Sequence, residues 1–189
     1  MTLAIIGQGN MGKGLAARLQ GKTDVVTAGR ADAAGAIKAA DVVVLAVPYE
    51  AALELASAHD FAGKIIVDIT NALKPDFSGI TVGFDTSAAE EIQTRAKGAR
   101  VVKAYNTIFA DHFARPEATT ANVPVFLAGN DEAAVAEVAE IVRLSGFRPE
   151  LTGSLDAARL IEPMAMLNIR LGYGLGKGTG IAPAWLEAA

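Results

Sequence analysis

Residues 3–12 read LAIIGQGNMG, an apolar run that leads into a glycine-rich turn and then into an alanine-rich segment. Gly7, Gly9 and Gly12 have the spacing G-x-G-x-x-G, and a second apolar run, Asp24–Ala28, follows within the length of one βαβ unit. In such a turn the first glycine permits the tight bend, the second lets a pyrophosphate approach the backbone, and the third lets the helix pack on the sheet. The stretch therefore predicts a dinucleotide-binding turn. The alternative, a plain strand–helix corner, needs only one glycine.

Short β-branched runs alternate with alanine-rich segments along the rest of the chain, which predicts an α/β fold of the Rossmann type with a doubly wound, mainly parallel sheet. The expected strands are Leu3–Ile6, Asp24–Ala28, Val42–Val47, Lys64–Asp68, Arg100–Tyr105, Val123–Ala128 and Phe147–Leu151. The expected helices are Met11–Leu19, Ala31–Ala39, Glu50–Ala58, Ala88–Lys97 and Glu132–Leu144. Ser87 and Glu90 have the spacing of a capping box, and Asn130 or Asp131 is expected to cap the helix that begins at Glu132.

The C-terminal part has a different composition, so we expect a Rossmann domain over residues 1–153 and a small extension, residues 154–189, packed on the same domain. Asp156–Tyr173 predicts one helix, with Ser154 as its cap and a kink at Pro163. The glycine-rich stretch Gly172–Pro183 follows it. Both a tail that closes over a ligand and a frayed terminus fit such a composition.

Composition excludes several classes of function. The chain of 189 residues has a net charge of -4 and no basic block, which argues against nucleic acid as a partner. It contains no cysteine, and its two histidines, His59 and His112, are far apart, so we expect neither a metal site nor a histidine-based triad. The N-terminal apolar run lacks the features of a signal peptide, and no stretch approaches the ~20 apolar residues of a membrane span. We therefore expect a cytoplasmic protein that does not associate with a membrane.

The end of the second expected strand bears on the choice of cofactor. NAD-dependent enzymes usually place an acid there to bind the ribose hydroxyls, but this chain has Gly29 and Arg30. We expect Arg30 in the first turn of the next helix, where the helix dipole disfavours a cation and a 2'-phosphate would offset that cost. NADP is therefore favoured over NAD. A plain surface arginine and a ribose contact from Asp32 are the alternatives.

Other strands are expected to end at the same edge of the sheet, where ligands bind in such folds. The residues there are Val47-Pro48, Asp68 to Asn71, and Asn106 to Ala110. No pair of side chains stands out as the proton relay that oxidation of an alcohol requires. Hydride transfer between two redox rings needs mainly positioning, and the sequence favours that chemistry.

Five blocks carry a resemblance to a known family: GQGNMGKGLA (7–16), AGR (28–30), VVLAVPYEAA (43–52), VVKAYNTIFA (101–110) and GSLDAARLIEPMAMLNIRLGYG (153–174). In this order they resemble the NADP oxidoreductases that depend on the deazaflavin coenzyme F420. VDITN (67–71), VVKAYN and GSLDAARLIE are also similar to the cytoplasmic reductase domain of the STEAP metalloreductases, whose membrane half has no counterpart here. The resemblance implies a Rossmann domain that binds NADP(H) and exchanges hydride with F420, FMN or FAD.

The resemblance also implies roles for particular residues. Arg30 matches the arginine that meets the 2'-phosphate, Val47 and Pro48 would line the nicotinamide end, and Ile108 and Ala110 match a loop whose backbone meets the carboxamide. The glycine-rich tail would lie near the second ring. The full expected cofactor-binding set is Gly7, Gln8, Gly9, Asn10, Met11, Gly12, Gly29, Arg30, Ala46, Val47, Pro48, Asn71, Asn106, Ile108 and Ala110.

Three departures from the family pattern bear on affinity and on the second ring. Gly29 stands where the family often has a serine that bonds the 2'-phosphate, and Ala34 lies near the position of a lysine. Asn106 replaces the histidine of the deazaflavin enzymes and matches the STEAP form instead. The first two changes imply weaker NADP binding than is usual in the family. The third leaves open whether the second ring is a deazaflavin or a flavin.

Other functions are compatible with the same N-terminal pattern. A reductase of imino or β-hydroxy acids needs a substantial helical second domain, and only about forty residues follow the last expected strand. A non-catalytic NADP(H)-binding redox sensor is the other alternative, because the fold alone does not specify function. Homodimers are common among small domains, and the expected surface is the C-terminal helix with Met164, Met166 and Leu167. Packing of these residues into the protein's own core is the alternative.

Overall fold

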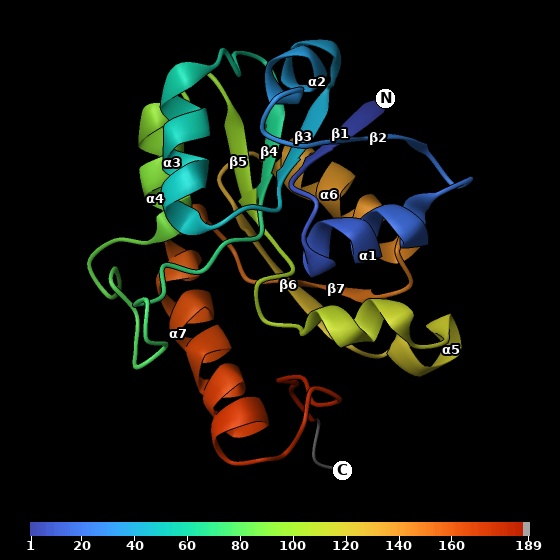
Figure 1. Cartoon of the computed structure of the whole chain (residues 1–189), viewed down its shortest axis with the longest axis vertical. Coiled ribbons are helices and arrows are strands. Elements are labelled where there is room, and N and C mark those ends of the chain that lie inside the picture. Colours follow the sequence, from blue (N-terminus) through green and yellow to red (C-terminus); the bar gives the residue numbers. More distant parts are fainter. Residues whose placement is uncertain (187–189) are drawn as a thin grey trace.

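A seven-stranded sheet runs through the middle of the protein. The chain passes from this sheet into a C-terminal helix that extends beyond the carboxyl ends of the strands (Figure 1). The computed structural model describes residues 1–186. The sheet has the order β2-β1-β3-β4-β5-β6-β7, and only the β5–β6 pair is antiparallel. This confirms the predicted mainly parallel Rossmann-type sheet. The strands are β1 (Thr2–Ile6), β2 (Asp24–Ala28), β3 (Val42–Leu45), β4 (Ile65–Asp68), β5 (Arg100–Lys103), β6 (Pro124–Gly129) and β7 (Arg148–Leu151).

Helices cover both faces of the sheet because its central strands are apolar on both sides. Leu3 and Ile5 of β1 pack with α1 (Asn10–Leu19) and α6 (Glu132–Leu144) in one core. Ala4 and Ile6 of the same strand face the other core. That second core contains α2 (Ala33–Ala39), α3 (Tyr49–Ala58) and α4 (Ala88–Arg95). The two cores make the doubly wound arrangement that the alternating pattern predicts.

Two strands end earlier than the apolar runs suggest. The run predicted as Val42–Val47 is a strand only to Leu45, and the run predicted as Arg100–Tyr105 is a strand only to Lys103. Tyr105 adopts a left-handed conformation with φ of 58°, which an extended strand does not accommodate. The remaining apolar residues of both runs belong to the loops at the edge of the sheet. Two short helices of that region, η1 (Ala110–Ala114) and α5 (Glu117–Thr120), had no clear sequence signal.

The predicted caps of α4 and α6 are present. The Ser87 hydroxyl accepts a hydrogen bond from the Glu90 backbone N–H at 3.2 Å and donates one to the Glu90 carboxylate at 2.8 Å. Asp131 caps α6 by accepting a hydrogen bond from the Ala134 N–H at 2.7 Å. Of the two predicted caps for α6, Asp131 is therefore the one used.

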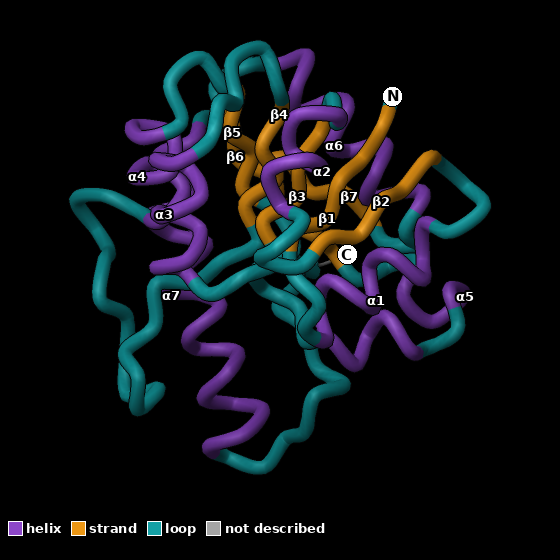
Figure 2. The backbone as a smooth tube through the Cα atoms, turned by 45° about the horizontal axis from the view of Figure 1, so that its top comes forward, coloured by secondary structure: helices purple, strands orange, loops and turns teal. Residues whose placement is uncertain are grey.

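The C-terminal region contains η2 (Leu155–Ala157), α7 (Ala158–Ile169) and a π-helical turn, η3 (Arg170–Gly174). These elements follow one another over the range predicted as a single helix, with Pro163 inside α7. Ser154 precedes η2, but its side chain makes no capping hydrogen bond. The tube view shows α7 leaving the sheet and a loop leading on from it (Figure 2). No helix within residues 1–186 is long and apolar enough to cross a lipid bilayer.

The glycine-rich tail is held against the rest of the protein. Its Gly178 N–H donates to the Gly172 carbonyl at 3.0 Å, and the Thr179 hydroxyl donates to the Asp111 carboxylate. Nε2 of His112 lies 3.1 Å from the Ile181 carbonyl oxygen. The tail is therefore anchored on η1 as far as Ile181. This part of the tail is not a frayed terminus.

Candidate cofactor-binding site

The glycine turn after β1 is shaped by close backbone contacts. Gly7 has a φ of 124°, and its N–H donates to the Ala28 carbonyl at 2.9 Å. A Cβ at Gly7 would lie 2.0 Å from the Ala46 carbonyl oxygen, and one at Gly12 would lie 2.2 Å from the Gly7 carbonyl oxygen. No side chain fits at those distances, so the protein's own packing requires glycine at both positions.

Gly9 is different, because the protein's own packing does not require a glycine there. Its φ of -75° suits any residue, and a Cβ on it would meet no atom of the described chain within 4 Å. Gly9 is also the N-cap residue of α1, whose first turn has neither a capping side chain nor an acid. The unpaired N–H groups of that turn and the open space beside Gly9 fit a pyrophosphate.

A pocket of about 290 Å³ adjoins the turn on the side of β2 and α3. Gly7, Arg30, Val47 and Glu54 contribute to its walls. The expectation that Arg30 lies in the first turn of a helix is wrong, because α2 begins only at Ala33 and Arg30 lies in the preceding turn. The dipole argument for a 2'-phosphate therefore fails. The location of Arg30 at the carboxyl end of β2, beside the pocket, keeps the residue available for such a contact.

The side chain of Arg30 is 91% exposed, and its Nη2 lies 3.2 Å from Glu54 Oε2. A cation with one exposed carboxylate partner can exchange it for a phosphate at small cost. Asp32, the proposed ribose acid, is the N-cap residue of α2 and does not line the pocket. A Cβ at Gly29 would approach the Gln8 side chain at 3.5 Å, an ordinary contact, so a serine would fit there.

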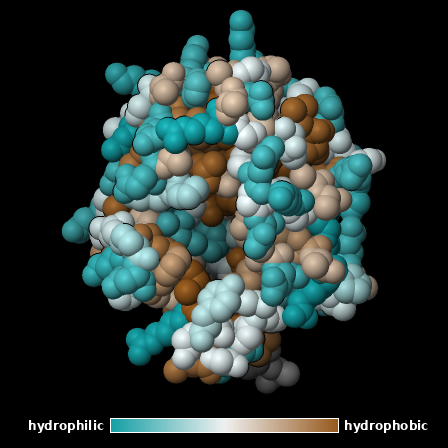
Figure 3. Space-filling view, viewed as in Figure 1, coloured by the Kyte–Doolittle hydropathy of each residue, from teal (hydrophilic) through white to brown (hydrophobic). Residues whose placement is uncertain are grey.

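A larger cavity of about 600 Å³ lies on the other side of the turn, beyond the carboxyl ends of β4 and β5. The space-filling view shows a hollow near the middle of one face, with hydrophobic side chains on its walls (Figure 3). Five residues expected at the cofactor site meet here, although they are far apart in the sequence: Met11, Asn71, Asn106, Ile108 and Ala110. The other lining residues are Ile69, Phe77, Tyr105, Thr107, Phe109, Ala165, Asn168, Ile169 and Tyr173.

Asn71 and Asn106 hold the edge of this cavity together. Each side-chain amide donates to the other residue at 2.9 Å, from Asn71 Nδ2 to the Asn106 carbonyl and from Asn106 Nδ2 to Asn71 Oδ1. Two other polar atoms, Asn106 Oδ1 and Thr107 Oγ1, are buried without a partner within residues 1–186. Buried polar atoms are usually hydrogen-bonded, so these two atoms fit a ligand with polar groups at its rim.

Three further residues of the predicted cofactor site lie outside this cavity. Val47 lines the smaller pocket with Arg30, Ala46 lies against Gly7, and Pro48 is exposed at the start of α3. None of the three lines the 600 Å³ cavity. Their assignment to the nicotinamide end stays a prediction.

A buried ion network behind the cavity was missed by the sequence analysis. Nζ of Lys103 lies 2.9 Å from Asp68 Oδ2 and 2.8 Å from Glu162 Oε1, and at most 1% of any of these side chains is exposed. Burial opposes the charge on Lys103, but the two carboxylates overcome that effect and hold the pKa of Lys103 above its usual range. A lysine that directly follows two valines in an expected strand was the available signal, because buried charges need partners.

The same network fixes the wall of the cavity. Glu162 lies on α7 and also accepts hydrogen bonds from the Ala88 and Ala89 N–H groups at the start of α4, at 3.0 and 3.3 Å. Ala165, Asn168 and Ile169 of α7 line the cavity one to two turns further along. Lys103 itself does not line it. The network therefore positions α7 against the strand ends and has no direct contact with the cavity.

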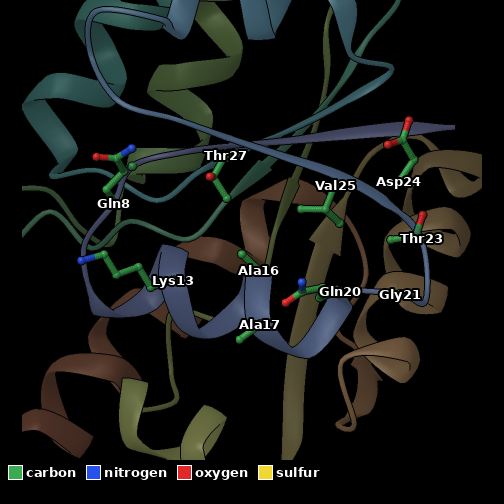
Figure 4. A pocket seen from close by; sticks show the side chains of 11 residues that line it. Gln8, Lys13, Ala16, Ala17, Gln20, Gly21, Thr23, Asp24, Val25 and Thr27 are labelled. Atoms are coloured by element: carbon green, nitrogen blue, oxygen red, sulfur yellow. The ribbon is translucent and has the colours of Figure 1, made fainter.

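A groove of about 720 Å³ also runs beside α1 and the outer edge of β2. Gln8 and Lys13 lie toward one end of it and Asp24 toward the other (Figure 4). This groove follows the side of an edge strand, whereas ligands in doubly wound folds bind across the carboxyl ends of the strands. We therefore assign the candidate site to the glycine turn and the two cavities beside it.

These features define a Rossmann-type α/β protein with a glycine turn after β1 and a mainly apolar cavity beside that turn. The model of the family described as NADP oxidoreductase, coenzyme F420-dependent, matches residues 22–72. The F420-dependent NADP reductase of Methanocaldococcus jannaschii is 29% identical over 177 residues, which are 88% of this chain and 76% of that protein. A crystal structure of a candidate F420-dependent NADP reductase from Arthrobacter sp. FB24 superposes with a TM-score of 0.80 at 29% identity, covering 95% of this chain and 96% of that one.

The metalloreductase STEAP3 of Rattus norvegicus is 30% identical over 182 residues, which cover 87% of this chain and 36% of that protein. Both resemblances read from the sequence blocks are thus found again over most of the chain. Over most of its length, therefore, the chain is similar to coenzyme F420-dependent NADP reductases.

Proposed function

We propose that this protein is an NADPH-dependent oxidoreductase that transfers hydride between NADP(H) and a deazaflavin such as F420. The observation that carries the proposal is the arrangement of two cavities on either side of one uncapped helix N-terminus. A dinucleotide has the matching shape, with two ring systems joined by a pyrophosphate. The similarity to F420-dependent NADP reductases supports the same function.

The smaller pocket suits the adenosine half of the cofactor. Ile6 and Leu55 offer an apolar surface for a flat ring, and Arg30 at the rim would meet a 2'-phosphate. The N–H groups at the start of α1 would bind the pyrophosphate. Because the 2'-phosphate would compete with Glu54 for Arg30, we expect NADPH to bind better than NADH by only a modest factor.

The larger cavity suits the reacting rings. When bound, NADPH supplies a hydride from its nicotinamide ring. The chain's contribution is to hold two flat rings in contact and to keep water away, through Met11, Ile108 and Tyr173 on the walls. Asn106 Oδ1 and Thr107 Oγ1 would bond the polar rim of a ring and fix its orientation. FMN or FAD in place of F420 is the alternative for the second ring.

Stopped-flow mixing tests the proposal. The protein is mixed with NADPH and, in separate runs, with F420, FMN or FAD, and the absorbance of NADPH and of the acceptor is followed. We expect hydride transfer to one of these acceptors and a slower reaction with NADH. Tight NADPH binding with no transfer to any acceptor would refute the proposed activity and favour a redox sensor. Turnover of an imino or β-hydroxy acid would favour the other alternative.

We further propose that the protein forms a homodimer through the outer face of α7. Leu160 and Leu167 are exposed on this helix, and Leu151 and Trp185 are also exposed. Leu151, Leu160 and Trp185 line one shallow pocket, and exposed apolar surface of this kind is typical of interfaces. Light scattering of the wild type and of Leu160→Glu measures the oligomeric state, and a monomeric wild type would exclude the dimer. The cytoplasmic location stays a prediction.

A further inference from the structure

The loop between β4 and α4 carries two exposed phenylalanines in an unusual backbone conformation. Phe77 has a φ of 56° and is 63% exposed, and Phe84 has a φ of 66° and is 73% exposed. Left-handed backbone is disfavoured for large L-residues, and glycine or asparagine is usual there. An exposed aromatic ring adds a second unfavourable feature at each position.

Phe77 is held at the tip of a short hairpin. The Phe77 N–H donates to the Lys74 carbonyl at 2.9 Å, and the Lys74 N–H donates to the Gly79 carbonyl at 2.9 Å. Leu73 and Ile80 form an isolated antiparallel bridge at the base. This is a tight turn followed by a left-handed residue, a position that glycine usually occupies in hairpins. The hairpin thus presents an aromatic side chain where local backbone preference favours none.

Folding alone does not explain Phe77. Its side chain belongs to neither of the two cores that flank the sheet. It lines the 600 Å³ cavity instead, and it is the one lining residue that comes from the hairpin. Local strain that the fold does not require is more common at sites of function.

The rest of the cavity wall comes from other elements. Ile69 and Tyr105 lie at the strand ends, Ala165 and Ile169 belong to α7, and Tyr173 lies on η3. Tyr173 makes an edge contact with Phe109, with ring centroids 5.3 Å apart. Phe77 lies on a loop tip and is 63% exposed, and Tyr173 on η3 is similarly exposed, at 69%. A flat ligand ring in the cavity would cover Phe77.

We propose that Phe77 is a specificity-determining residue that packs on the second redox ring, the deazaflavin or flavin, and sets the affinity for that substrate. This inference rests on the proposed function. Aromatic pairs prefer offset or edge contacts and add to the gain from burying the ring. Phe77 would contribute to binding of the second ring and not to binding of NADPH, which the glycine turn and Arg30 hold.

The test compares Phe77→Ala with Phe84→Ala. Phe84 is a matched control, because it shares the loop, the exposure and the left-handed backbone but does not line the cavity. At saturating NADPH, we expect Phe77→Ala to raise the KM for F420 or FMN about tenfold, with kcat changed far less. Phe84→Ala should leave both constants unchanged. Phe77→Trp should restore the low KM, and the Kd for NADPH should be the same in all variants.

Two further measurements separate ring binding from strain and from activity. Phe77→Gly relieves the left-handed backbone, so its Tm should rise or stay the same while its KM rises as in Phe77→Ala. Quenching of F420 or FMN fluorescence, without NADPH, measures ring binding directly. If the wild type binds a ring but transfers no hydride, the proposed function fails, and loss of quenching in Phe77→Ala still supports this inference. Equal ring affinity in the wild type and Phe77→Ala, or no ring binding by the wild type, would overturn it.

Discussion

Replacing Gly9 with alanine separates the needs of the fold from those of the ligand. A Cβ at this position would meet no atom of the described chain within 4 Å, and the φ of -75° is ordinary for alanine. Alanine is a poorer N-cap residue than glycine. It also lowers the conformational entropy of the unfolded chain, which stabilises the fold by about 0.4–1 kcal/mol. We therefore expect the free energy of unfolding of Gly9→Ala to stay within about 0.5 kcal/mol of the wild type.

Binding of NADPH should change much more. A methyl group at Gly9 would fill the space through which a pyrophosphate approaches the N–H groups of α1. Hydrogen bonds to a charged group contribute about 1.5–3 kcal/mol, so their loss corresponds to a Kd roughly ten- to a hundredfold higher. Calorimetric titration with NADPH measures this effect, and thermal unfolding of the same sample checks the fold.

Two other glycines are matched controls. Gly35 on α2 also has open space around it, so Gly35→Ala should leave NADPH affinity unchanged. Gly12→Ala should destabilise the fold itself, because its Cβ would lie 2.2 Å from the Gly7 carbonyl oxygen. If the Kd of Gly9→Ala for NADPH lies within about twofold of the wild-type value, the pyrophosphate assignment is refuted, because so small a change corresponds to less than ~0.5 kcal/mol.

Three further predictions concern charged groups. Lys103→Met leaves two buried carboxylates without a cation, so we expect the free energy of unfolding to fall by about 3–5 kcal/mol and the Tm by roughly 6–20 °C. A thermal melt with no shift in Tm would contradict this. Glu54→Gln frees Arg30, so NADPH should bind up to about fivefold tighter in a titration, whereas an equal gain for NADH would contradict a 2'-phosphate contact. Hydrogen bonding from Arg159 holds the pKa of Glu90 below its ordinary 4.5. The ion pair therefore stabilises the fold above that pH and is lost as the pH falls through the lowered pKa. Urea unfolding should show Glu90→Gln less stable by up to about 1 kcal/mol at neutral pH and equal to the wild type in strong acid, and a pH-independent difference would contradict this.

The amino-acid sequence determined the parts of this protein that depend on local preference. The turn from Gly7 to Gly12 is encoded by spacing, because backbone crowding there admits only glycine at two positions. The caps at Ser87 and Asp131 follow from side chains that satisfy nearby N–H groups. The alternation of apolar strands and helices was sufficient for the doubly wound sheet. The division at residue 153 into a domain and an extension stays a prediction.

Only the tertiary structure decided which distant residues meet. Asn71 and Asn106 bond across the cavity mouth, and Lys103 finds Glu162 on a helix that follows much later in the chain. Phe77 stands in a loop for which the sequence allowed no prediction, and its place on the cavity wall became visible in the folded chain. The physical reason is that burial and pairing of polar groups depend on packing between elements that are remote in sequence, whereas turns and caps depend on neighbours a few residues away.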